Sequence, residues 1–165
     1  YATWAGTLLD PEVPIVIIAE PGRETEAATR LGRIGFDRIA GYLDGGMQAL
    51  DARPDLVRRT ERITAATLAE QLASPRPPAM LDIRTQKEWQ EKRIEGTLNI
   101  PLNRLPERIQ EVPRTGTVVT YCESGYRSTI AASLLEQHGV EAVTDLVGGI
   151  SAWEAAGLQT LSAEN

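Results

Sequence analysis

Short apolar runs alternate along the chain with segments whose apolar residues recur at helical spacing. The run 64–74 has helical periodicity, whereas 79–83 and 118–121 are short, apolar and rich in strand-forming residues. The segment 97–102 reads as a further short strand, which Pro101 ends. Strands that alternate with helices predict an α/β fold, with a doubly wound and mainly parallel sheet that carries helices on both faces.

Polar residues mark where two of the helices begin. Thr85 and Glu88 have the spacing of a capping box, which predicts a helix that starts after Thr85. A second helix is expected to begin near Arg127 or Ser128, after a Gly-containing loop. Cys122, the one cysteine of the chain, stands between the preceding strand and that loop. It therefore lies at the carboxyl end of a parallel strand, where such sheets bind their ligands.

The chain contains an internal repeat, because residues 15–50 echo residues 119–153. Both segments read as a strand, a Gly-bearing loop, an amphipathic helix, a short strand, a Gly-Gly pair and another helix. In this alignment Ala19 takes the place of Cys122, so the first copy cannot perform the chemistry of the thiol. The paired glycines of the two copies are Gly45 and Gly46, and Gly148 and Gly149.

The two copies differ in how much sequence precedes them, and this difference predicts the domain organisation. We expect residues 63–160 to form a complete domain, 1–53 to be the C-terminal half of a related module, 54–62 to be a linker and 161–165 a tail. A half-module leaves a sheet edge open. We therefore expect it to dock on the intact domain or on a partner chain that carries the missing half. The chain begins with Tyr1 rather than Met, which favours a fragment or a processed product.

Composition and charge narrow the classes of function. A formal net charge of −6 over 165 residues disfavours a nucleic acid or an anionic membrane as the partner. The apolar runs are too short to span a bilayer. One cysteine and one histidine exclude an internal disulfide and disfavour a zinc or iron site. We expect no metal or cofactor in this chain, and a reducing cytoplasm is the compartment that best fits a lone thiol.

The position of Cys122 alone is compatible with two interpretations. The residue can be a buried cysteine without reactivity. Alternatively, it is a nucleophile on display at the mouth of the loop, with a thiolate stabilised by loop amides and by the N-terminus of the next helix. Arg127 would add a fixed positive charge that holds an anionic substrate. Glu123 is expected to point outward, toward a partner or a cationic substrate group, because a carboxylate turned toward the sulfur would oppose its ionisation.

Three motifs in order give the region 63–160 a resemblance to a known family. Residues 122–127 read C-x-x-G-x-R, residues 81–102 read "LDIRTQKEWQEKRIEGTLNIPL", and Gly148 begins a Gly-Gly-x-x-x-W motif. Together they resemble the rhodanese family of sulfurtransferases. The resemblance implies that Cys122 is the catalytic residue. It further implies substrate binding by Glu123, Ser124, Gly125, Tyr126 and Arg127, and support of the loop by Asp82, Arg84 and Ser128.

The reaction that this resemblance implies is the transfer of sulfane sulfur. Thiosulfate or a low-molecular-weight persulfide would donate sulfur to Cys122, and the resulting persulfide would pass it to a thiol or to cyanide. Many thiosulfate-using members carry a basic residue after the cysteine, whereas this chain has Glu123, a difference that weighs against thiosulfate. Cysteine-dependent phosphatases of related fold use C-x₅-R, one residue longer than the spacing from Cys122 to Arg127. A phosphatase or arsenate reductase, and a non-catalytic docking module, remain the alternatives.

Residues 1–53 carry a narrower resemblance of their own. The segments "YATWAGTLL" and "PIVIIAEPGRE" are similar to the cysteine-less rhodanese module of bacterial fusion proteins. Those proteins begin with a metallo-β-lactamase-fold domain of the persulfide-dioxygenase type and end with an active rhodanese. The resemblance implies that an iron site belongs to a preceding domain. The expected partners are a small sulfur donor and a thiol acceptor, with a homo-oligomer or contact with that preceding domain as further possibilities.

Overall fold

The computed structural model describes residues 2–162, and the chain divides into two compact units between Arg59 and Thr60. The second unit contains a five-stranded sheet in the order β3-β7-β6-β4-β5, in which every adjacent pair is parallel. Its strands are β3 (Glu61–Ile63), β4 (Ala79–Asp82), β5 (Leu98–Asn99), β6 (Val118–Tyr121) and β7 (Val143–Leu146). Its helices are α3 (Ala65–Leu72), α4 (Gln86–Glu91), α5 (Leu105–Arg108), α6 (Tyr126–Gln137) and α7 (Gly149–Ala155).

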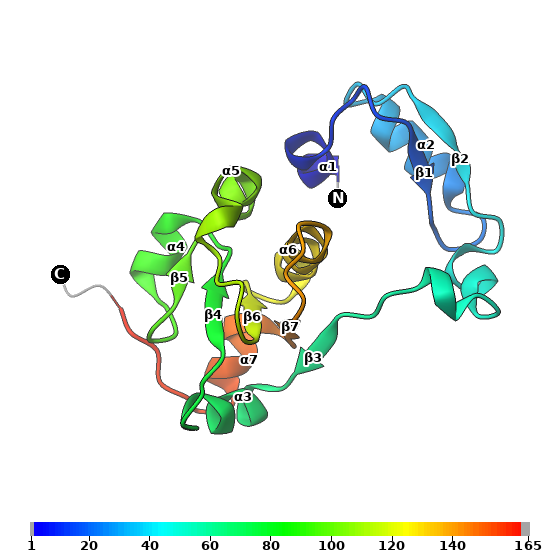
Figure 1. Ribbon diagram of the computed structural model, residues 1–165. Coiled ribbons are helices and arrows are strands. Elements are labelled where there is room, and N and C mark those ends of the chain that lie inside the picture. The colour runs from blue at the N-terminus through cyan, green and yellow to red at the C-terminus, as the bar shows by residue number, and fades with distance from the viewer. Residues whose placement is uncertain (1, 163–165) are drawn as a thin grey trace. The chain divides into compact units, whose positions relative to one another are not determined.

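Helices cover both faces of this sheet, which confirms the predicted α/β fold. Figure 1 shows α3 and α7 beside one face and α6 beside the other. On the first face Val119 and Tyr121 of β6 pack with Leu68 of α3 and Ile150 of α7 in one buried apolar cluster. All four residues of β6 are buried, as expected for a central parallel strand.

Several local predictions hold, and one strand is shorter than expected. Thr85 and Glu88 form a complete capping box at the start of α4. The strand predicted at 97–102 is confined to Leu98–Asn99, because the chain turns into a 3-10 helix directly after Pro101. None of the helices within residues 2–162 has the length and hydropathy to cross a membrane.

The predicted linker 54–62 is wrong at its end, where Glu61 and Arg62 belong to the edge strand β3. Their backbone pairs in parallel with β7. The Arg62 side chain also reaches the buried carboxylate of Asp145, with Nε 3.3 Å from Oδ2. Polar residues are tolerated here because an edge strand exposes one side to water. At the other end of the domain, Leu161 of the predicted tail exchanges two backbone hydrogen bonds with Arg93, while residues 163–165 lie outside the described part.

The first unit is smaller and is built on the two parallel strands β1 (Ile15–Ile17) and β2 (Ile39–Tyr42). The helices α1 (Ala2–Leu8) and α2 (Glu24–Gly32) and two 3-10 helices, Gly46–Leu50 and Pro54–Leu56, complete it. Its core consists of Ile17, Leu31 and Phe36 with partly buried neighbours. The helix expected after the first Gly-Gly pair is thus a 3-10 helix.

The two copies of the repeat share one backbone arrangement. Gly45 and Gly46 have φ values of 76° and 60°, and Gly148 and Gly149 have 73° and 59°. A Cβ built on Gly46 would overlap the carbonyl oxygen of Ala19, and one built on Gly149 would overlap that of Cys122. Each Gly-Gly turn is therefore pressed against the backbone at the end of the equivalent strand, which places Ala19 and Cys122 at matching positions.

The two copies of the repeat differ in how well β1 and the equivalent strand β6 are buried. Val119 and Tyr121 of β6 are 0% exposed, whereas Val16 and Ile18, their counterparts at β1, are 63% and 50% exposed. In the second unit β4 pairs with β6, but β1 pairs only with β2 among the described residues. The first unit therefore presents an apolar strand surface that the complete domain keeps buried.

The matched valines give a direct test of this difference. Val119→Ala is expected to lower the free energy of unfolding by roughly 2–3 kcal/mol, because it removes two fully buried methyl groups and leaves a cavity. Val16→Ala should change it by about 0.5 kcal/mol or less, since an exposed side chain loses little packing. Urea unfolding followed by circular dichroism measures both, and equal costs would contradict the difference in burial.

Candidate active site

The predicted site residues meet at the carboxyl ends of β4 and β6. The chain leaves β4 toward β5 on one side and returns to β6 on the other, so the order of strands reverses between them. Ligands of doubly wound sheets bind at this kind of switch point. Asp82 ends β4, and Cys122 directly follows β6.

Cys122 lies under its loop and is held there by polar contacts. The residue is only 1% exposed, so the expectation of a sulfur on display is wrong. The backbone N–H of Gly125 nevertheless points at Sγ, with nitrogen and sulfur 3.1 Å apart, and Ser128 Oγ lies 3.7 Å from the sulfur. In the neutral residue the thiol donates to Ser128 Oγ, so the Gly125 N–H is the group aimed at the sulfur, where it can stabilise the negative charge of a thiolate or persulfide.

The helix after the loop begins slightly earlier than predicted. α6 starts at Tyr126, not at Arg127 or Ser128, because Gly125 takes the N-cap position with φ 104°. The Gly125 carbonyl accepts hydrogen bonds from the Thr129 N–H and from Ser128 Oγ. The positive end of the α6 dipole is thereby directed at the loop.

The loop is fixed from the opposite side by the start of α7. The N–H groups of Ile150 and Ser151 donate to the carbonyls of Cys122 and Glu123, at 2.9 and 3.1 Å. This close approach requires Gly149, whose added Cβ would also lie 2.7 Å from the Glu123 carbonyl oxygen. The backbone of the cysteine is therefore held by main-chain contacts that any larger residue at 149 would disturb.

Arg84 forms the buried support of the loop. It is 1% exposed, and its guanidinium group donates to both carboxylate oxygens of Asp82 and to the carbonyl of Lys92. Burial alone would lower the pKa of Arg84, but the hydrogen bonds and charge of Asp82 outweigh it and leave that pKa raised. The third guanidinium nitrogen of Arg84, Nη1, lies 3.4 Å from a carboxylate oxygen of Glu123.

Glu123 is directed away from the sulfur, as expected, but its carboxylate is held by residues of the chain itself. One carboxylate oxygen lies near Arg84, and the other accepts a hydrogen bond from Ser151 Oγ at 3.0 Å. The side chain stays 46% exposed, so it forms part of the rim of the site. Ser124 and Tyr126 are the exposed residues of the loop.

Arg127, predicted to hold an anionic substrate, is paired with Glu88. Its two terminal nitrogens donate to the two carboxylate oxygens of Glu88, at 3.0 and 2.6 Å. This bidentate contact with Arg127 is the main reason why the pKa of Glu88 falls from 4.5 to about 2. One of these oxygens, Oε2, also serves the capping box of α4, since it accepts a hydrogen bond from the Thr85 N–H at 2.9 Å.

Sequence reasoning missed three contributors to the site. The sequence pattern predicts a capping role for Glu88 and no role for Ser151. Asp145 of β7 is 1% exposed and interacts with Ser128, and its Oδ1 has no hydrogen-bond partner among the described residues. Burial raises the pKa of Asp145. The sequence offers only their positions as a signal, because Glu88 lies within the motif segment 81–102 and Ser151 lies within the Gly-Gly-x-x-x-W motif.

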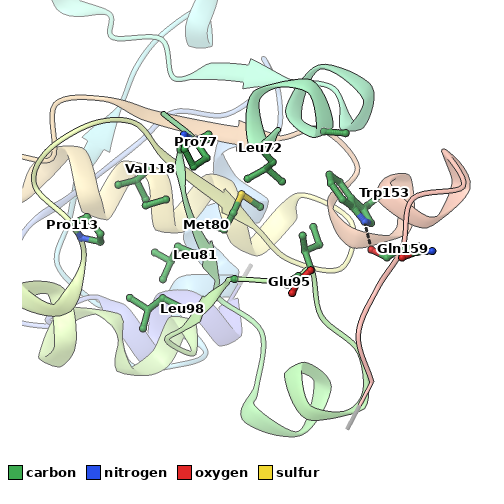
Figure 2. Close-up of a pocket in the computed structure, with 15 residues that line it drawn as sticks. Leu72, Pro77, Met80, Leu81, Glu95, Leu98, Pro113, Val118, Trp153 and Gln159 are labelled. Carbon is green, nitrogen blue, oxygen red and sulfur yellow. Dashed lines mark hydrogen bonds between the residues drawn. The ribbon is translucent and has the colours of Figure 1, made fainter. Parts of the chain in front are cut away.

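Other parts of the second unit offer less to this chemistry. Within residues 2–162 no three His, Cys, Asp or Glu side chains come together as a metal site. A pocket of about 620 Å³ lies near the amino ends of β4 and β6, where Met80, Leu81, Val118 and Trp153 line it (Figure 2). It includes no residue of the Cys122 loop.

Substitution of Gly149 tests the main-chain support of the loop. Gly149→Ala should cost several kcal/mol of stability or displace the loop, because the new Cβ overlaps a carbonyl that cannot move independently. Gly157→Ala is the matched control, since Gly157 also has a positive φ of 74° but nothing within 4 Å of its Cβ. It should cost only about 1 kcal/mol of backbone strain. Thermal unfolding compares the two, and similar losses would contradict the contact.

The low pKa of Glu88 predicts an acid-dependent stability. A carboxyl with a pKa of about 2 in the folded state and 4.5 as its ordinary value binds fewer protons when folded. Its contribution is therefore complete above pH 4.5 and is lost as the pH falls toward 2. Glu88→Gln should flatten this part of the curve of unfolding free energy against pH. An acid limb that is equally steep in the variant would show that the ion pair is not formed in solution.

Comparison with known proteins agrees with this geometry. Residues 64–156 match the family described as Rhodanese-like domain. A protein of Allochromatium vinosum named sulfurtransferase is 37% identical over 102 residues, which cover 62% of this chain and 95% of that protein. The adenylyltransferase and sulfurtransferase uba4 of Ogataea parapolymorpha is 28% identical over 100 residues, 60% of this chain and 25% of that protein.

Solved structures show the same relationship. The crystal structure of a rhodanese-related protein from Thermoplasma volcanium has a TM-score of 0.57 and 30% identity, and covers 63% of this chain and 99% of its own. That of a rhodanese-like domain protein from Staphylococcus aureus has a TM-score of 0.56 and 26% identity, with 62% and 100% covered. The matched residues include β4, the Cys122 loop and α7. The chain belongs to the rhodanese-like domain family.

Proposed function

We propose that this chain is a sulfurtransferase that carries sulfane sulfur on Cys122. The observation that carries the proposal is the Gly125 N–H, 3.1 Å from the Cys122 sulfur at the N-terminus of α6. A curled backbone that directs N–H groups at a sulfur suits a thiolate before transfer and a persulfide after it. Relatives with the same domain that are named sulfurtransferases support this assignment.

The reaction would proceed in two displacements. The Cys122 thiolate attacks the sulfane sulfur of the donor, the donor's bond to that sulfur breaks, and its electron pair leaves with the donor fragment. A thiol or cyanide then removes the outer sulfur and regenerates the thiolate. The chain has no second cysteine, so the acceptor is another molecule. Because Cys122 is covered, the donor would enter past the exposed residues Ser124 and Tyr126.

Asp82, Arg84 and Ser128 would support the loop in this scheme. Arg84 is buried on Asp82 and reaches Glu123, so it ties the end of β4 to the loop after β6. Ser128 bonds to Gly125 and lies beside the sulfur. This set needs no metal, and we propose that the chain works without a cofactor of its own.

We also propose that residues 1–53 are the second half of a silent rhodanese-like module. Ala19 stands where Cys122 stands in the active domain, and the Gly46 and Gly149 turns are alike. The missing half, from a preceding segment or a partner chain, would cover Val16 and Ile18. We propose further that a metallo-β-lactamase-fold domain with an iron site precedes this module, and that the protein works in the cytoplasm.

Intact-mass measurement tests the enzymatic proposal. After incubation with thiosulfate or glutathione persulfide, the wild-type chain should gain the mass of one sulfur atom, and Cys122→Ser should gain none. The single cysteine assigns any such adduct to Cys122.

The outcome also separates the alternatives. Hydrolysis of an aryl phosphate without any sulfur uptake would favour a cysteine-dependent phosphatase. If the wild type neither takes up sulfur from any donor nor hydrolyses the phosphate, a non-catalytic docking module becomes the better interpretation.

A further inference from the structure

The charged side chains beside the Cys122 loop are paired with one another. Three carboxylates, from Asp82, Glu88 and Glu123, face two guanidinium groups, from Arg84 and Arg127. Both guanidinium groups lie within ion-pair distance of a carboxylate. The local balance of formal charge is therefore negative rather than positive.

Arg127 stands in the first turn of α6, between Gly125 and Ser128, which both contact the sulfur. Its pKa is raised mainly by its hydrogen bonds to Glu88, and the charge of Cys122 adds to that rise. The Arg127–Glu88 contact is 2.6 Å at its shortest, and the two side chains are only 19% and 31% exposed. Water screens such a contact less than it screens a surface pair. The positive charge that Arg127 brings to the start of α6 is thus largely cancelled by Glu88.

The two classes of sulfur donor, thiosulfate and thiol persulfides, bring different amounts of negative charge to the Cys122 loop. With thiosulfate, Cys–S⁻ and ⁻S–SO₃⁻ give Cys–S–S⁻ and SO₃²⁻, so three negative charges meet at the loop. With a thiol persulfide, Cys–S⁻ and HS–SR give Cys–S–SH and RS⁻, so the reacting atoms carry a single negative charge. Gathering three charges near paired cations in a poorly solvated site is costly, because the repulsion grows as the effective dielectric constant falls.

We propose that Glu88 is a specificity-determining residue, which neutralises Arg127 and thereby directs the site to thiol persulfides in preference to thiosulfate. This inference rests on the proposed sulfurtransferase function and names its donor class. Glu88 does not touch the reacting sulfur. It acts through the guanidinium group of Arg127. Its effect on the rate of sulfur transfer is therefore larger for thiosulfate, the donor with the larger negative charge.

Glu88→Gln removes the negative charge of Glu88 while it preserves the fold around it. A glutamine at this third helical position can still complete the capping box with Thr85, so α4 keeps its start. The substitution frees the positive charge of Arg127 without shortening the side chain. Sulfur transfer to cyanide should be measured with thiosulfate and with the persulfide of 2-mercaptoethanol, whose leaving group has no charge beyond its thiolate.

The expected result is a change in donor preference. The ratio of kcat/KM for thiosulfate to kcat/KM for the persulfide should rise about tenfold in Glu88→Gln, as expected for restoring one unit of charge beside the loop. A variant that is merely less stable would lose activity toward both donors equally and leave the ratio unchanged.

Glu91→Gln is the matched control. It removes the same charge from the same helix, but Glu91 is exposed and pairs with Lys87 at 3.8 Å. Its donor ratio should equal that of the wild type, and a tenfold rise in this control as well would overturn the assignment to Glu88. An unchanged or lower ratio in Glu88→Gln would also overturn it, even if the wild type transfers sulfur. If the wild type accepts sulfur from neither donor, the proposed function fails instead.

Discussion

The close approach of Gly149 to the carbonyls of Cys122 and Glu123 is the contact on which the rest of the site depends. Strand β6 delivers the cysteine to the edge of the sheet, but a strand end alone leaves the following residues free. The N–H groups of Ile150 and Ser151 remove that freedom by binding two successive carbonyls. With those carbonyls engaged from outside, the loop can turn the Gly125 N–H inward to the sulfur.

The charged residues add a second level of support around this backbone. A buried guanidinium group is stable only if its charge and its donors are matched, and Asp82 and the Lys92 carbonyl match those of Arg84. Arg127 and Glu88 connect the N-terminus of α6 to that of α4 in the same way. Residues that look like an anion-binding set therefore serve largely to join elements far apart in the sequence. This arrangement makes the loop rigid and leaves each of the two guanidinium groups paired with a carboxylate.

The fold and the location of the site follow from local sequence patterns, whereas the pairing of charges does not. Apolar runs and the Thr85–Glu88 spacing predict the strands and the start of α4, because both are set by neighbours within a few residues. The Arg127–Glu88 contact joins residues 39 positions apart, and no periodicity reports such a partner. The burial of Cys122 and the edge strand at Glu61 depend likewise on how α6, α7 and β7 pack.

The first copy of the repeat shows the same turn beside a residue that has no thiol, Ala19. Gly46 is pressed on the Ala19 carbonyl as Gly149 is on that of Cys122, although an alanine has no chemistry to offer. The turn is therefore a structural element in both copies, because it connects the strand before it to the helix after it. The backbone of this turn therefore forms whether a thiol or a methyl group ends the strand, which makes the geometry of the turn independent of the side chain that would react.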